Sequence, residues 1–193
     1  MTDLNSAQAD MRLAYLSGAP GMFMSAAAWL AAATTALVAS PKQAVWVLFI
    51  GGALIHPVST LLCKVLGRSG KHAPGNPLAP LAFATTLWMI FCLLLVYGVS
   101  VLRIEWFFPA MLLVIGGRYL TFSLLFAMRL YWFVGLTLAA SGYLLGRASV
   151  APAWSGFTGA AIEAVFATVI LIASLREVRA NNSLGDFRST PGA

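Results

Sequence analysis

Residues 106–146 read WFFPAMLLVIGGRYLTFSLLFAMRLYWFVGLTLAASGYLLG, an almost unbroken apolar run of 41 residues. As a single helix, rising 1.5 Å per residue, this run would be about 60 Å long, roughly twice the hydrocarbon thickness of a bilayer. The run must therefore reverse once and form two antiparallel helices. The reversal can fall at residues 116–118 or near Arg129. The first choice leaves only about a dozen residues before the break, too few to cross a membrane. We therefore place the turn at residues 128–130.

The composition of the whole chain predicts that its solvent is a membrane. Of the 193 residues, 60% are hydrophobic and 9% are charged, whereas soluble domains carry about 25% charged residues. The net charge is +6, but the basic residues stand between apolar runs without clustering. That pattern favours topology signals and contacts with anionic lipid over nucleic-acid binding. Cys63 and Cys92 lie in apolar runs, so we expect reduced, packed thiols with no metal and no cofactor.

Further apolar segments lie before and after residues 106–146. Together with that run they predict an all-α polytopic fold, a bundle of six transmembrane helices. Residues 1–19 are predicted as a cytoplasmic segment with an interfacial helix, residues 20–176 as the transmembrane domain, and residues 177–193 as a disordered cytoplasmic tail. The six predicted spans cover residues 20–40, 44–66, 78–102, 106–128, 131–147 and 156–175.

The distribution of lysine and arginine predicts the orientation of these spans. Eight of these residues fall on one side of the predicted bundle and three on the other. The side richer in positive charge faces the cytoplasm, which places both termini there. The eight are Arg12, Lys64, Arg68, Lys71, Arg129, Arg176, Arg179 and Arg188, and the three are Lys42, Arg103 and Arg147.

Three ionisable residues fall inside predicted spans: His56, Arg118 and Glu163. An arginine at the centre of a spanning helix costs about 2.5–3.5 kcal/mol on translocon scales, so a compensating partner is expected. His56 and Arg118 lie about 18 Å from the outer helix end, and Glu163 lies about 10 Å from it. Glu163 is the only acidic residue within a predicted span. We expect Arg118 to pair with Glu163, directly or through water, with His56 as a third member.

Small and helix-distorting residues accompany these groups. Pro57 follows His56 directly and frees a backbone carbonyl, and Gly51 and Gly52 stand one turn earlier, so a kinked helix is expected there. The spacing of Gly142 and Gly146 fits close helix packing, within the bundle or in a homo-oligomer.

Two readings of the ionisable trio stay open. In the first, His56, Arg118 and Glu163 line a small polar intramembrane site of a transporter- or permease-like protein for a small solute or ion. In the second, they lock the packing of a structural or accessory protein that assembles with itself or with a membrane partner. The sequence contains no catalytic motif, so we expect no enzyme.

Four stretches resemble an uncharacterised family of small bacterial multi-pass membrane proteins, a domain of unknown function. They are ADMRLAYLSGAPG at 9–21, GGALIHPVS at 51–59, NPLAPL at 76–81 and GRYLTFSLLFAMRLYW at 117–132. The resemblance covers most of residues 9–175 and implies a bacterial inner membrane protein in contact with the lipid bilayer. It implies no activity.

Overall fold

The long apolar run folds as two antiparallel helices, α5 (Phe107–Phe126) and α6 (Leu130–Arg147). The chain reverses after α5, where Ala127 takes a left-handed conformation with a φ of 52°. Gly116 lies within unbroken helix and packs against α6. A Cβ atom on Gly116 would stand 2.7 Å from the carbonyl oxygen of Gly135. The backbones of α5 and α6 therefore lie in contact at Gly116 and Gly135, where only glycine leaves enough space.

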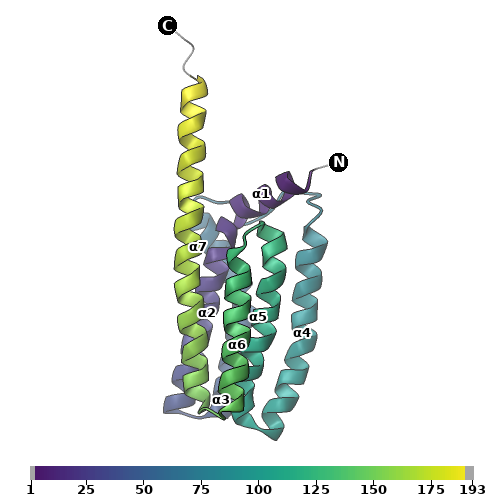
Figure 1. Ribbon diagram of the computed structural model, residues 1–193, viewed down its shortest axis with the longest axis vertical. Helices are drawn as coiled ribbons and strands as arrows, with labels where there is room; N and C mark the ends of the chain where they lie inside the picture. The colour runs from purple at the N-terminus through teal and green to yellow at the C-terminus, as the bar shows by residue number, and fades with distance from the viewer. Residues whose placement is uncertain (1–2, 190–193) are drawn as a thin grey trace.

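The computed structural model describes the backbone of residues 3–189 and the side chains of residues 3–177. Every regular element in this part of the chain is helical. Figure 1 shows the long helices side by side, with α1 lying across one end of the bundle and α7 extending beyond that end. The other elements are α1 (Leu4–Tyr15), η1 (Leu16–Gly18), α2 (Ala19–Val38), α3 (Pro41–Val65), α4 (Ala79–Leu102), η2 (Ile104–Trp106) and α7 (Pro152–Ser189).

Five helical stretches of the described chain are long and apolar enough to cross a membrane, which indicates a membrane-embedded multi-pass protein. They are Leu4–Val38, Pro41–Val65, Ala79–Leu102, Ile104–Phe126 and Pro152–Glu177. α6 runs beside α5 in the bundle but is not among the five. The prediction of six spans and that of two cytoplasmic termini therefore stay predictions.

The C-terminal region differs from the prediction of a disordered tail at residues 177–193. The backbone of α7 continues as helix to Ser189. No proline interrupts residues 177–189, and extending an existing helix costs far less than starting a new one. Residues 190–193 lie outside the described part of the chain.

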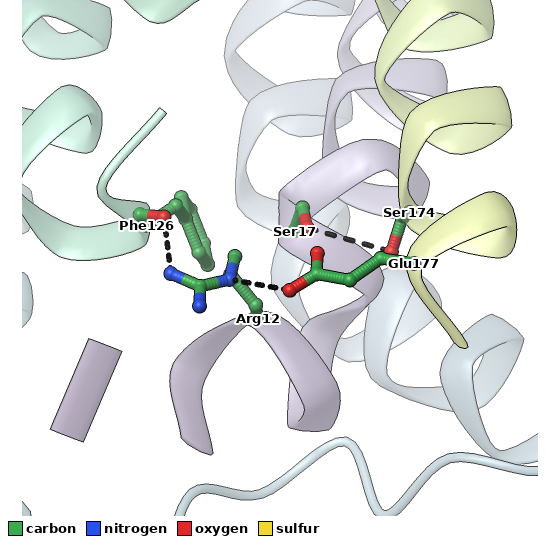
Figure 2. A network of polar contacts seen from close by, with 5 residues as sticks. All are labelled: Arg12, Ser17, Phe126, Ser174 and Glu177. Carbon is green, nitrogen blue, oxygen red and sulfur yellow. Dashed lines mark hydrogen bonds and ion pairs between the residues drawn. The ribbon is translucent and has the colours of Figure 1, made fainter. Parts of the chain in front are cut away.

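Helix α1 caps the end of the bundle where α5 stops. The last carbonyl groups of a helix have no partner within it, and two side chains of α1 supply donors to them. Gln8 Nε2 donates to the carbonyl oxygen of Leu124 over 2.7 Å, and Arg12 Nη1 donates to that of Phe126 over 3.0 Å. Arg12 Nε also lies 3.4 Å from Glu177 Oε1 on α7. Figure 2 shows the Arg12 guanidinium between these two helices.

A tight turn joins this cap to the first long helix. Gly18 takes a φ of 84°, which favours glycine, and a Cβ atom there would stand 2.6 Å from the Tyr131 hydroxyl. That hydroxyl donates to the carbonyl oxygen of Ser17. The turn therefore needs glycine for both its conformation and its close approach to α6.

The loop between α3 and α4 is also tied to α1. Asp10 Oδ2 accepts from the backbone N–H of Ala73 over 2.9 Å and from Asn76 Nδ2 over 2.7 Å. Asn76 is buried and donates a second bond to the carbonyl oxygen of Ala7. The amphipathic N-terminal helix is thus a fixed part of this end of the molecule.

The account of α1 as a cap predicts the effect of Arg12→Ala. The substitution leaves the Phe126 carbonyl and the Glu177 carboxylate without their shared partner, at a cost of about 1–2 kcal/mol. The apparent melting temperature in detergent should fall by several degrees. Lys64→Ala removes one positive charge from an exposed residue near the end of α3, and it should leave the melting temperature unchanged. Equal melting temperatures for the two variants would contradict the capping role.

Candidate functional site

Small residues on one face of α7 bring it close to α2. A Cβ atom on Gly159 would stand 2.9 Å from the Trp29 ring, and one on Gly156 would stand 2.9 Å from the Cβ of Ala33. Glu163 follows Gly159 by four residues and therefore lies one turn further along the same face. The close approach of the two helices encloses the carboxyl group of Glu163 inside the bundle.

Glu163 is fully buried, with an exposed fraction of 0%. Ser25 and Trp29 from α2 and Tyr119 from α5 surround its carboxyl group. Both carboxyl oxygens of Glu163 lack a hydrogen-bond partner among the described residues. The donors of the three side chains are therefore close to the carboxyl group but outside hydrogen-bond geometry. Trp29 Nε1 is also buried without a partner. So is Ser155 Oγ, which lies about two turns before Glu163 on α7.

A carboxylate in such a place is unfavourable, because it has lost its water and has gained no hydrogen bond and no counter-charge in contact with it. The group is stable there as a neutral acid carrying a proton, or as a carboxylate beside a bound cation. Chemically, the arrangement is suited to taking up and releasing one positive charge.

Arg118 lies on a different face of α5 and points toward α4. Its Nη2 donates to Thr86 Oγ1 over 3.1 Å, and its Nη1 lies 2.9 Å from Met89 Sδ. The guanidinium carbon stands 5.4 Å from the centre of the Phe122 ring, a favourable cation–π distance. Its Nε is buried without a partner.

The structure does not bring the predicted trio together. The direct Arg118–Glu163 contact is wrong, since the described residues contain no ion pair between them within 4.0 Å. Arg118 is near enough for its charge to act on Glu163 electrostatically, but the two groups do not touch. The reason is rotational. Successive residues of an α-helix point about 100° apart, and the residue of α5 that faces Glu163 is Tyr119.

His56 is separate from both groups. Its side chain is exposed on the outer surface of α3, as is that of Pro57. α3 continues as one helix from Pro41 to Val65 through this proline. Gly51 packs against α2, where a Cβ atom would stand 2.8 Å from the Cβ of Ala28, whereas Gly52 meets nothing within 4 Å.

The two other singled-out glycines lie between α5 and α6. A Cβ atom on Gly142 would stand 2.6 Å from the carbonyl oxygen of Pro109, and one on Gly146 would stand 3.3 Å from the Cβ of Pro109. Both glycines are buried. They serve packing within this bundle, so neither presents a free face to a second copy.

The described residues contain no group of three or more histidine, cysteine, aspartate or glutamate side chains that would hold a metal ion. The model of a family of unknown function, DUF7010, matches residues 4–173. The chain belongs to the DUF7010 family. No curated protein and no solved structure matches it significantly.

The environment of the buried carboxyl in this DUF7010 chain includes three residues that the sequence pattern does not indicate. Ser25, Trp29 and Tyr119 each stand in a helix that is apolar on most of its surface, so the sequence does not mark them as neighbours of Glu163. One signal was available for α7. Small residues at 155, 156 and 159 mark the face that packs closely, and Glu163 continues that face.

Gly159→Ala tests the close packing that encloses Glu163. The added methyl group meets the Trp29 ring at 2.9 Å and Leu112 at 3.0 Å, so it should lower the free energy of unfolding by about 1–3 kcal/mol. Gly98→Ala on α4 is the matched control, because a Cβ atom there meets nothing within 4 Å. Thermal unfolding of the two variants in detergent measures the difference. A Gly159→Ala protein as stable as Gly98→Ala would mean that α2 and α7 are not held this closely.

Proposed function

We propose that this DUF7010 protein is a transporter-like membrane protein for a small solute or ion, in which Glu163 binds and releases a proton or small cation. The observation that carries the proposal is the full burial of a carboxyl group that has no hydrogen-bond or ion-pair partner among the described residues. Ionisable residues inside a membrane are costly and mark ion and proton pathways more often than packing contacts. No chemical reaction is assigned to the protein.

The groups that face Glu163 support an occluded site. α2 contributes the neutral side chains of Ser25 and Trp29, and α5 contributes the Tyr119 hydroxyl, with the positive charge of Arg118 further away. All of these groups are hydrogen-bond donors. They would favour the anionic carboxylate after the proton or cation has left.

The proposed topology has six spans with both termini in the cytoplasm, in a bacterial inner membrane. α6 has 18 residues and would reach about 27 Å, close to the roughly 30 Å of a bilayer core. Its charged ends, Arg129 before it and Arg147 at its end, fall where water would meet the membrane. The excess of lysine and arginine on the side of α1 supports its cytoplasmic placement.

The second candidate function is a structural or accessory protein that acts by assembling with a second copy or another membrane protein. The feature that favours it is α4, which packs mainly on α5 and exposes an apolar outer face. In that function Glu163 would stay dry and neutral throughout.

Solvent access to the carboxyl distinguishes the two candidates. In a chain without Cys63 and Cys92, Ser25→Cys places a thiol beside Glu163 with little change in size. A transporter must expose this position to water in part of its cycle, so a small membrane-impermeant thiol reagent should modify it. Leu30→Cys, on the exposed face of α2, should be covered by lipid and stay unmodified, while Ser69→Cys in a loop should react fully.

Complete protection of Ser25→Cys beside full modification of Ser69→Cys would contradict the transporter proposal. The accessory function would then be the better account of the buried carboxyl. Equal modification of Ser25→Cys and Leu30→Cys would mean that the reagent reaches lipid-facing positions in detergent. The measurement is then repeated after the protein is reconstituted into lipid vesicles, where lipid covers Leu30→Cys.

A further inference from the structure

A cleft of about 450 Å³ opens between α4 and α5 on the side of the bundle. Trp88 and Leu113 form apolar walls, Thr85 and Cys92 line the α4 side, and Arg118 stands on the α5 side. This volume falls in the range of about 300–1,000 Å³ typical of small-molecule sites. Gly117 forms part of the wall, and a Cβ atom there would meet nothing within 4 Å.

The guanidinium in this cleft has no negative partner. It contacts only a threonine hydroxyl and a methionine sulfur, its Nε–H has no acceptor, and no described carboxylate lies within 4.0 Å of it. A guanidinium carries five N–H donors, of which these contacts occupy two. A cation so placed in a bilayer is stabilised strongly by an anion, and guanidinium matches a carboxylate through two parallel hydrogen bonds.

The position of the cleft restricts which anion can enter. Arg118 lies eight residues before the end of α5, which is about 12 Å along the helix. A phospholipid phosphate would have to be drawn that far from the hydrated membrane surface. A single carboxylate is smaller, and an attached hydrocarbon chain would lie along Trp88 and Leu113. α4 leaves its outer face exposed, with Phe83 70% and Leu94 71% exposed, so the cleft is reached from the bilayer.

We infer that the α4–α5 cleft binds a single-chain amphiphilic carboxylate, with its anionic head on Arg118 and its chain against the apolar walls. This site is distinct from Glu163 and does not rest on the proposed proton or cation exchange. The two assignments can therefore fail separately.

The test uses Cys92 as a local reporter, because amphiphiles also dissolve in detergent and in lipid. Cys92 is partly exposed in the cleft, whereas Cys63 is buried, and Cys63→Ala leaves Cys92 as the single thiol. The full chain is held in neutral detergent, and the rate of Cys92 modification by N-ethylmaleimide is measured with and without dodecanoate. Dodecanoate should slow the reaction saturably by about tenfold, as expected for a site occupied most of the time.

Two independent variants separate the head from the chain. Arg118→Gln removes the charge, and Gly117→Leu fills the cleft from a position with free space around it. Each should abolish the effect of dodecanoate. Gly98→Leu on α4, also in free space but outside the cleft, should retain it. Glu163→Gln should retain it too, which distinguishes a failure here from a failure of the proposed function.

Other amphiphiles and anions complete the test. Dodecanol and dodecyltrimethylammonium should give no protection at the same concentration. The inference is overturned if dodecanoate gives no saturable protection, if dodecanol protects equally, or if Arg118→Gln retains the effect. It is also overturned if acetate alone protects equally, or if phosphatidylglycerol in a nanodisc protects Cys92 without dodecanoate, since the ligand would then be a free anion or a lipid headgroup.

Discussion

The close contact of α2 with α7 is the constraint on which the interior of this protein depends. In a bilayer, apolar side chains gain little by leaving lipid for another helix, so packing must come from complementary shape. Trp29 is fully buried and covers Gly159, and Gly156 receives Ala33. With larger residues at either glycine the helices would separate, and lipid or water would reach the interior.

That contact creates the unusual environment of Glu163. The carboxyl lies one turn beyond Gly159, so the same approach that packs the helices removes its water. The described bundle offers hydroxyl and indole donors nearby but no hydrogen bond, and the charge of Arg118 acts on the carboxyl only from a distance. The proposed function uses this carboxyl group to bind a proton or a small cation. α1 is fixed across the other end of the bundle by Gln8, Asp10 and Arg12.

The helical membrane class followed from the composition and from the lengths of the apolar runs. The partners of the polar groups did not. Depth along a helix can be counted from its ends, but α5 is apolar on every side, so no stripe tells which face is inward. Arg118 and Tyr119 are neighbours in sequence, yet only Tyr119 faces Glu163. The small residues before Glu163 did carry that information, because in membranes they mark the packed face.

The central claim is that Glu163 and Arg118 belong to separate sites. A double-mutant cycle with Glu163→Gln and Arg118→Gln, measured as the free energy of unfolding in bicelles, tests it most directly. The account predicts near-additive effects, with a coupling below about 1 kcal/mol, as for groups that are not in contact. A larger coupling, with each single variant strongly destabilised and the double variant restored, would show that the two residues form a buried ion pair and would contradict the account.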